Sequence, residues 1–220
     1  MNSDDHLLSE PLALFGGTFD PVHYGHLRCA DEAREKLNLE KLYLLPSACP
    51  PHRTTPRASV EQRLEMLRLA LAEFPLLEID DRETRRSGPS YMVDTLEELR
   101  TEFPQRPLFL LIGQDASNHL HGWFQWQRLF ELTHIVILTR PGAKAEYRQD
   151  LAKQIERRLV PGVRDLLDSK AGGILNMEVT SIDVSATTIQ SIIRLGRSPA
   201  AMLPDAVLDY INENHLYLSS

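Results

Sequence analysis

Short apolar runs that favour β-strands alternate with longer segments of helical periodicity along the 220-residue chain. This alternation is typical of βαβ units, which build a parallel sheet. The sequence therefore predicts an α/β fold with a mostly parallel sheet flanked by helices. The expected strands are Leu12–Phe15, Leu42–Leu45, Leu76–Ile79, Leu108–Ile112, Ile135–Thr139 and Asn176–Val179.

The segments between these strands carry helix signals. Leu27, Ala30, Ala33 and Leu37 recur at spacings of three and four, which gives one apolar helical stripe. Ser59 followed by Gln62 has the spacing of a capping box, which opens a helix. Further helices are expected from Ser90, as an N-cap, to about Arg100, over Tyr147–Leu159, and from Ser185 to a left-handed stop at Gly196, whereas the proline-rich stretch Ser47–Arg57 is expected to be an irregular loop.

Composition excludes several classes of protein. The chain is 42% hydrophobic and 25% charged, so it is long and apolar enough to build a core without disulfides or metals. We expect one domain over residues 1–220, with about 185–220 as its C-terminal portion. The chain carries 24 Lys and Arg against 31 Asp and Glu, a net charge of −7. This acid excess argues against nucleic acid as a partner, because phosphate-backbone binding needs a basic face.

The sequence also argues against a membrane protein. No apolar run approaches the roughly 20 residues that cross a bilayer, and the N-terminus has acids where a secretory signal carries positive charge. Cys29 and Cys49 are two cysteines outside any CxxC or Cys/His cluster, so we expect two thiols rather than a disulfide. The expected location is the cytoplasm.

The segment from Gly16 to His26, which reads GGTFDPVHYGH, carries the clearest chemical signal. Two glycines after a buried strand let the main chain approach a ligand closely, and a helix that follows directs its free N–H groups at an anion. His23 and His26 are three residues apart, so a helix that has begun by His23 places both rings on one face. Imidazole N–H groups donate to phosphate oxygens. The segment therefore favours a phosphate site without a Walker lysine.

Each part of this segment has a simpler interpretation when taken alone. Two glycines after a strand are common, and a histidine pair at this spacing is often a surface or capping feature. Zinc is the rival ligand for the pair, but no third Cys, His or acid lies at a ligand spacing, and His119 and His121 are far away in sequence. The combination of glycines, histidines and helix start is what points to phosphate.

GGTFDPVHYGH resembles the GGxFDPxHxGH signature of the nucleotidyltransferase superfamily, and in its details it resembles the bacterial nicotinate-nucleotide adenylyltransferases. The resemblance extends over nearly the whole chain. Six later segments are similar to segments of that family: LLPSACPPHR (44–53), SYMVDTL (90–96), LIGQD (111–115), GWFQW (122–126), TRPG (139–142) and VSATTIQ (184–190).

The resemblance implies a Rossmann-like, doubly wound sheet with a small C-terminal helical portion that completes an ATP site. It also implies transfer of AMP from ATP to nicotinate mononucleotide, which gives nicotinate adenine dinucleotide and pyrophosphate in NAD synthesis. The expected cofactor is Mg²⁺, bound with ATP and held mostly by phosphate and water oxygens, so no protein metal ligand is expected. The expected partners are these two nucleotides, with no nucleic acid and no membrane, and assembly with identical subunits is left open.

The same resemblance assigns roles to individual residues. The expected catalytic residues are His23, His26 and Thr18. The expected ATP contacts are Gly16, Gly17, Phe19, His26, Gly113, Asp115, Ser185, Thr187 and Arg194. The expected contacts with the mononucleotide are Asp20, His52, Arg53, Tyr91, Met92, Trp123, Phe124 and Arg140.

Several assignments have an alternative. Gln190 stands where the family has Arg, so the ATP-side role of its helix is in doubt, and Arg194 at i+4 is the residue that would restore the charge. Met92 replaces a usual threonine, which matters little if a backbone amide binds the nicotinate. Trp123 suits either stacking on the pyridine ring or packing in the core. His52 and Arg53 could simply be solvated, and Asp115 could simply cap a helix.

Two further functions remain open at this stage. The acceptor could be nicotinamide mononucleotide or phosphopantetheine instead, within the same superfamily. A non-catalytic nucleotide-binding sensor is the other alternative, and Gln190 is the residue that suggests it.

Overall fold

The computed structural model describes residues 10–50 and 55–218. Contacts between residues divide the chain into two compact units. The first unit comprises Met1–Leu14 and Tyr91–Met177, and the second unit comprises Phe15–Ser90 and Glu178–Ser220. The residues from 185 onward therefore belong to the same unit as the glycine turn. That the whole chain acts as one domain stays a prediction.

The strands confirm the predicted α/β class. They hydrogen-bond in the order β3-β2-β1-β4-β5-β6, in which the chain order reverses beside β1 as in a Rossmann-like sheet. Strands β2 and β3 pair in parallel, and strands β4 and β5 also pair in parallel. Each expected strand is present within two residues of its predicted bounds: β1 Leu12–Gly17, β2 Leu42–Pro46, β3 Leu77–Ile79, β4 Leu108–Gly113, β5 His134–Thr139 and β6 Ile174–Glu178.

The helices follow the periodic segments between the strands. The predicted capping box at Ser59 is present, and Ser185 is the N-cap of α8 as expected. Gly196 has a φ of 68°, which confirms the left-handed stop. The helices are α1 Tyr24–Lys36, α2 Val60–Ala70, α3 Met92–Glu102, α4 Gln114–Asn118, α5 Trp126–Leu132, α6 Gln149–Arg158, α7 Val163–Leu167, α8 Ala186–Arg194 and α9 Asp205–Glu213, with short 3-10 turns η1 Leu71–Glu73, η2 Arg82–Arg85 and η3 Leu120–Gly122.

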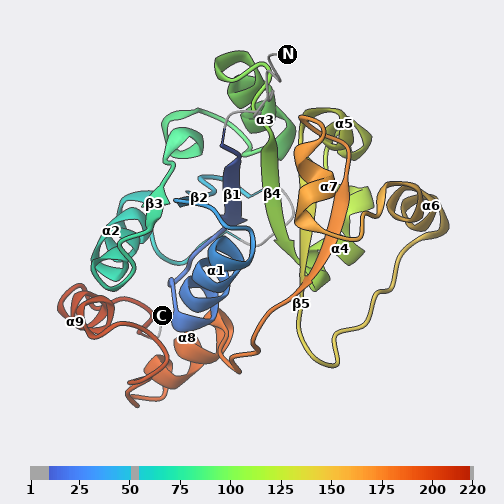
Figure 1. Ribbon diagram of the computed structural model, residues 1–220. Helices are drawn as coiled ribbons and strands as arrows, with labels where there is room; N and C mark the ends of the chain where they lie inside the picture. The colour runs from blue at the N-terminus through green and yellow to red at the C-terminus, as the bar shows by residue number, and fades with distance from the viewer. Residues whose placement is uncertain (1–9, 51–54, 219–220) are drawn as a thin grey trace. The chain divides into compact units, whose positions relative to one another are not determined.

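In the second unit the apolar stripe of α1 is buried as its spacing predicts. Leu27, Ala30 and Ala33 are fully buried, and α1 contacts β2. α2 lies beside α9, which comes from the C-terminal part of the chain (Figure 1). This packing brings the end of the chain against the helix that follows the proline-rich loop.

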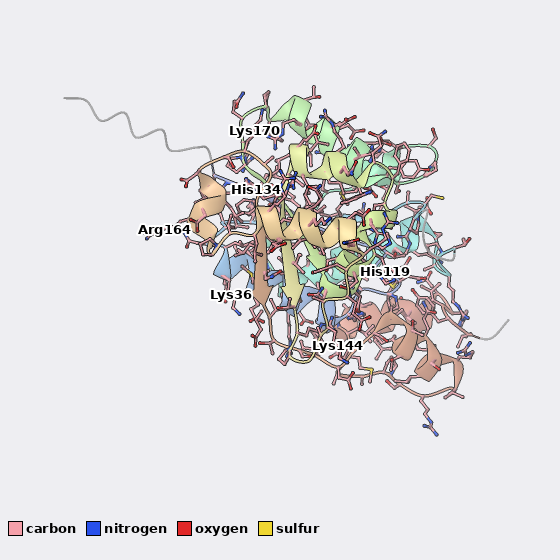
Figure 2. All side chains as sticks on the ribbon, turned by 90° about the vertical axis from the view of Figure 1, so that its right-hand side faces the viewer. Lys36, His119, His134, Lys144, Arg164 and Lys170 are labelled. Atoms are coloured by element: carbon pink, nitrogen blue, oxygen red, sulfur yellow. The ribbon has the colours of Figure 1, made fainter. Side chains whose placement is uncertain are left out.

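In the first unit β4 and β5 form the core. Every residue of Leu108–Leu111 is completely buried, as expected for a central parallel strand covered on both faces. The first residue of β5, His134, is buried as well. The charged residues Arg164 and Lys170 of the same unit are exposed (Figure 2). Among the described residues, no helix is long and apolar enough to cross a membrane.

Candidate active site

The turn after β1 is built around two close contacts with glycine. Phe19 is buried and has a left-handed φ of 51°. Its ring lies over the backbone of Gly17, where an added Cβ would come within 2.7 Å of the ring. The same ring packs edge-on against His26, with 5.1 Å between ring centroids. Gly17 is therefore required by the packing of Phe19, and the predicted glycine floor is present at the end of β1.

His23 and His26 lie together at the start of α1. Their rings are stacked, with centroids 3.7 Å apart and planes inclined by 24°. The helix begins at Tyr24 rather than at His23, which is its N-cap in an extended conformation. The ring of His23 covers Gly25, where a Cβ would meet Nδ1 at 2.9 Å. His23 is only 4% exposed and His26 is half-buried, so His26 is the more accessible ring.

The N-terminal end of α1 suits an anion. This helix lies wholly within the described residues. Its first turn contains no acidic residue, and the N-cap residue His23 makes no side-chain capping bond. The positive end of the helix dipole is therefore not neutralised by a carboxylate of its own first turn. The accessible His26 ring stands in that first turn.

Asp20, between the glycines and the histidines, is a buried carboxylate with only 8% exposure. Its Oδ2 accepts from the amide of Arg57 at 2.8 Å, and its Oδ1 accepts from the amide of Ala58 at 3.2 Å. Oδ1 also accepts from the hydroxyl of Tyr217 at 2.6 Å. With Gln190 as a weaker fourth donor at 3.4 Å, these bonds match the acceptor capacity of a carboxylate. Asp20 therefore ties the turn after β1 to Arg57, Ala58 and Tyr217, and its predicted contact with the mononucleotide stays a prediction.

Gln190 has a defined task in α8. Its Nε2 donates to the backbone carbonyl of Asp20 at 2.7 Å, so it is directed at the turn after β1. Arg194 is exposed in the last turn of the helix. At the other end Ser185 caps α8 by accepting from the amide of Thr188 at 3.1 Å, and Thr187 is exposed. The resemblance implies an arginine at position 190. The uncharged Gln190 that is present there instead forms a hydrogen bond that fixes Asp20.

Arg63 is a residue of this region that the sequence interpretation missed. It is 1% exposed, and its Nη1 donates to the carbonyls of Thr18 at 2.7 Å and Ser47 at 2.8 Å. Burial lowers the pKa of its guanidinium, and the charge of Asp20 opposes that shift. Arg63 therefore ties the end of β1 to the loop after β2. The available signal was an arginine on the apolar face of α2, beside Leu64 and Leu67.

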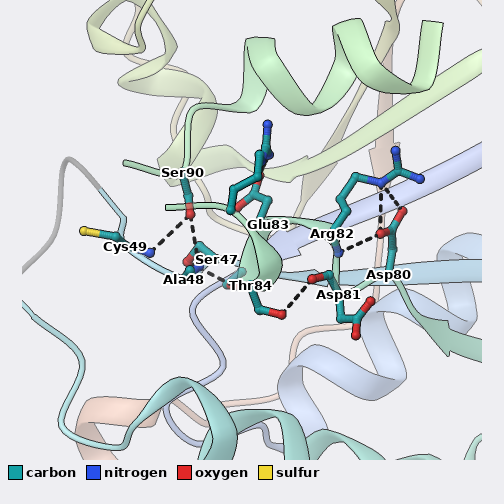
Figure 3. Close-up of polar contacts among 11 residues, drawn as sticks. Ser47, Ala48, Cys49, Asp80, Asp81, Arg82, Glu83, Thr84 and Ser90 are labelled. Carbon is teal, nitrogen blue, oxygen red and sulfur yellow. Dashed lines mark hydrogen bonds and ion pairs between the residues drawn. The ribbon is translucent and has the colours of Figure 1, made fainter. Parts of the chain in front are cut away.

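Ser90 corrects one expectation from the sequence. It does not cap a helix, because α3 begins at Met92 with Tyr91 as its N-cap. Instead its Oγ accepts from the amides of Ala48 at 3.0 Å and Cys49 at 3.1 Å (Figure 3). Ser90 thus fixes the first part of the proline-rich loop. His52 and Arg53, in the same loop, lie outside the described residues.

The remaining site candidates lie in the first unit. Gly113 ends β4 and is also the N-cap residue of α4. The exposed Asp115 follows within the first turn of that helix. Asp115 is therefore not the cap of this helix. Next to it, the side-chain Nε2 of Gln114 donates to Ser117 Oγ and Tyr147 Oη, both at 2.9 Å.

An aromatic group stands at the start of α3. The rings of Tyr91 and Phe124 have centroids 4.5 Å apart, and Phe124 is 46% exposed. Trp123 is half-buried, and Arg140 is exposed after β5. Met92 is the first residue of α3, so its amide is one of the helix N–H groups that have no partner within the helix. The first unit therefore brings Tyr91 and Phe124 together, and the roles of Trp123, Met92 and Arg140 stay predictions.

The part of the chain that the structure describes contains no group of three His, Cys, Asp or Glu side chains able to hold a metal ion. Cys29 is buried and Cys49 is exposed, and both are free thiols, as expected.

Comparison with known proteins identifies the family. Residues 14–192 match the cytidylyltransferase-like family model. A protein of Methylococcus capsulatus described as a probable nicotinate-nucleotide adenylyltransferase is 47% identical over 94% of this chain and 99% of its own length. A protein of the same description from Halorhodospira halophila is 45% identical over 94% of both chains.

Solved structures agree on the fold. The Plasmodium falciparum nicotinic acid mononucleotide adenylyltransferase complexed with NaAD superposes with a TM-score of 0.74 over 94% of this chain and 97% of its own, at 14% identity. The chain therefore belongs to the cytidylyltransferase-like proteins and, among them, to the nicotinate-nucleotide adenylyltransferase family.

Proposed function

We propose that this protein transfers AMP from ATP to nicotinate mononucleotide, forming nicotinate adenine dinucleotide and pyrophosphate. The observation that carries the proposal is the stacked pair of His23 and His26 beside the glycine turn that ends β1. Family membership, at 47% and 45% identity to relatives of that name, supports the same activity.

The chemistry needs no general base. An oxygen of the mononucleotide phosphate attacks the α-phosphorus of ATP, a new P–O bond forms, and the bond from that phosphorus to the bridging oxygen of the leaving pyrophosphate breaks. The attacking phosphate is already ionised, so no proton has to be removed from it. Rate acceleration then depends on positioning and on stabilising the charge of the leaving pyrophosphate.

His26 is the residue that we assign to direct phosphate contact. Its ring is the more accessible of the pair and lies in the first turn of α1, where the helix dipole favours an anion. His23, which is 4% exposed, supports that ring by stacking and offers its small exposed edge to the same phosphates. The half-buried Thr18 and the glycines before it line the approach. One donor of this kind contributes roughly 100-fold to kcat.

Mg²⁺ is proposed to arrive with ATP. Such an ion neutralises the triphosphate and is held mainly by phosphate and water oxygens. The carboxylate of Asp20 already accepts from the amides of Arg57 and Ala58 and from the hydroxyl of Tyr217, so we do not assign the ion to it.

The remaining proposed contacts are given by the unit in which each residue lies. For ATP we propose Gly16, Gly17, Phe19, Ser185, Thr187 and Arg194 in the second unit, and Gly113 and Asp115 in the first. For the mononucleotide we propose Tyr91, Met92, Trp123, Phe124 and Arg140. The 46% exposure of Phe124 and the position of Met92 as the first residue of α3 support a flat ring that bears a carboxylate.

Acceptor choice is the sharpest test of this proposal. The purified protein is incubated with ATP, Mg²⁺ and one of nicotinate mononucleotide, nicotinamide mononucleotide or phosphopantetheine, and pyrophosphate release is measured. Backbone amides that bind a carboxylate lose an acceptor when it becomes an amide, so kcat/KM should favour nicotinate mononucleotide by at least about 100-fold. Equal kcat/KM values for the three acceptors would reject nicotinate mononucleotide as the specific acceptor. ATP binding without pyrophosphate release in the presence of any acceptor would favour a nucleotide-binding sensor.

The cytoplasm is the compartment we propose for this activity. The two free thiols support a reducing environment, in which an exposed cysteine such as Cys49 stays reduced.

A further inference from the structure

The C-terminal part of the second unit reaches the start of α1, where the amide of Tyr24 donates to the carbonyl of Met202 at 2.9 Å, and it also binds Asp20 in the turn before that helix. The Tyr217 hydroxyl donates to its carboxylate at 2.6 Å, and the Gln190 amide donates to its carbonyl oxygen at 2.7 Å. Asp20 stands three residues before His23. One residue next to the histidine pair is therefore held at its side chain and at its backbone by groups more than 150 residues away in sequence.

The bond from Tyr217 is well isolated from water. Tyr217 is 6% exposed and Asp20 is 8% exposed. Burial, followed by the negative charge of Asp20, raises the pKa of Tyr217 far above its ordinary value, so the hydroxyl stays protonated and remains a donor. A hydrogen bond to a charged acceptor in a buried place contributes more than one between neutral groups in water.

The turn tolerates little movement. The ring of His23 lies directly on Gly25, and the ring of Phe19 lies directly on Gly17. Arg63 holds the carbonyl of Thr18 at the other end of the turn. A shift of Asp20 would therefore change the angle or the distance at which His23 stacks on His26.

We propose that Tyr217 and Gln190 are positioning residues for adenylyl transfer: by holding Asp20 they keep the imidazole of His23 stacked on His26. This rests on the function proposed above and adds the residues that prepare its site. Neither residue is proposed to touch a substrate. Gln190, the residue that suggested a non-catalytic sensor, then has a structural task at this turn.

The first test is the Tyr217→Phe variant, which removes one hydroxyl and keeps the ring. The matched control is Tyr210→Phe, on α9 of the same unit. Loss of one buried bond to a carboxylate should lower kcat about tenfold. KM for ATP and for nicotinate mononucleotide should change less than twofold, because no substrate contact is removed. Gln190→Met, of similar length without a donor, should reproduce this split, and unchanged kcat in both variants would overturn the proposal.

A second readout separates positioning from loss of folded protein and from failure of the proposed activity. The ring-proton NMR signals of His23 and His26 report their stacking through ring-current shifts and need no substrate. We expect these signals to move in Tyr217→Phe and Gln190→Met and to stay in place in Tyr210→Phe, at a temperature where urea titration shows each variant folded. Unmoved signals in both variants would reject positioning even if the parent protein makes no dinucleotide.

Discussion

Single residues around the turn after β1 carry most of the geometry of the candidate site. Gly25 is the clearest case, because an added Cβ would meet the ring of His23 at 2.9 Å and the carbonyl of Val184 at 3.3 Å. The ring of His23 has to move if that position carries a side chain. A glycine in the HxGH pattern therefore serves the stacking of the two histidines.

Gly25→Ala should lower kcat by about tenfold or more, because the stacked ring is displaced from its place. Gly162→Ala is the matched control, since its Cβ would lie at an ordinary 3.5 Å from Asp165. Steady-state pyrophosphate release from ATP and nicotinate mononucleotide measures both. Equal activity of the two variants would show that the position of the His23 ring has no effect on the rate.

Arg63 gives a stability prediction at the same scale. Arg63→Ala leaves the carbonyls of Thr18 and Ser47 without this donor, and each buried unsatisfied group costs about 1–3 kcal/mol. The free energy of unfolding in urea should fall by about 3 kcal/mol. Arg68→Ala on the same helix removes only an exposed pair with Glu65 and should cost less than about 1 kcal/mol. A loss no larger than that of the control would contradict the tie between β1 and the loop after β2.

The sequence predicted that the two histidines lie together near the glycine turn, but it did not predict the hydrogen bonds that hold this turn. His23, His26 and the glycines were found because their residue types and spacing are themselves the signal. Arg63, Gln190 and Tyr217 were not given their structural roles, because hydrogen bonds between residues as distant as 20 and 217 leave no periodicity. The hydrogen bonds of Asp20 were missed for the same reason, since its donors come from Arg57, Ala58 and the C-terminal part of the chain.

At the scale of elements, periodicity and capping signals were reliable. The uninterrupted run of β4 and the stripe of α1 are buried as predicted. Ser59 and Gln62 form the expected reciprocal bonds. Ser90 was assigned wrongly because serine accepts from backbone amides in a loop as readily as at a helix end, and only the fold brings Ala48 and Cys49 to it.

The capping box of α2 can be tested directly. Ser59→Ala removes the acceptor for the amide of Gln62, and the free energy of unfolding should fall by about 1 kcal/mol. The exposed Ser87→Ala, outside any helix or strand, is the control and should stay within about 0.5 kcal/mol of the parent. Urea denaturation measures the free energy of unfolding of both variants. An equal decrease in both would show that the Ser59 side chain does not stabilise α2.

His134 at the start of β5 predicts a pH dependence of stability. Its Nδ1 accepts from the amide of Gly173 at 3.0 Å, and its Nε2 lies 2.8 Å from the carbonyl of Ser169, which requires the neutral ring with Nε2 protonated. Burial lowers the pKa of His134 below its ordinary 6.5, despite the bond to Ser169. Below pH 6.5 the unfolded chain binds a proton that the folded chain resists, so this contribution is present above pH 6.5 and is lost as pH falls.

The unfolding free energy should accordingly decrease from pH 7.5 to pH 5.5, with at most about 1.4 kcal/mol per pH unit from this one group. His134→Gln, which does not titrate, should show a shallower slope over the same range. Urea titrations at several pH values measure both proteins. A slope that is identical in parent and variant would mean that His134 does not contribute to it.

At the scale of the whole molecule, the order of the strands is that of a Rossmann-like sheet, and the activity is argued from the family and from the site. The chain order reverses beside β1, and β1 is the strand that leads into the glycine turn and the histidine pair. The division into two units was not predicted from the sequence, because the boundary passes through β1 between Leu14 and Phe15 without any change of composition. The C-terminal residues nevertheless share a unit with the turn, which composition alone does not indicate.

The most direct test of this account is the rate at which an α-phosphorus label of ATP appears in nicotinate adenine dinucleotide, measured for the parent, His26→Ala and the control Arg68→Ala. We predict label transfer by the parent and the control, and a rate at least about 100-fold lower for folded His26→Ala, because one phosphate donor is lost. Full label transfer by His26→Ala would contradict the role given to the stacked histidines, and no transfer by the parent would contradict the proposed reaction.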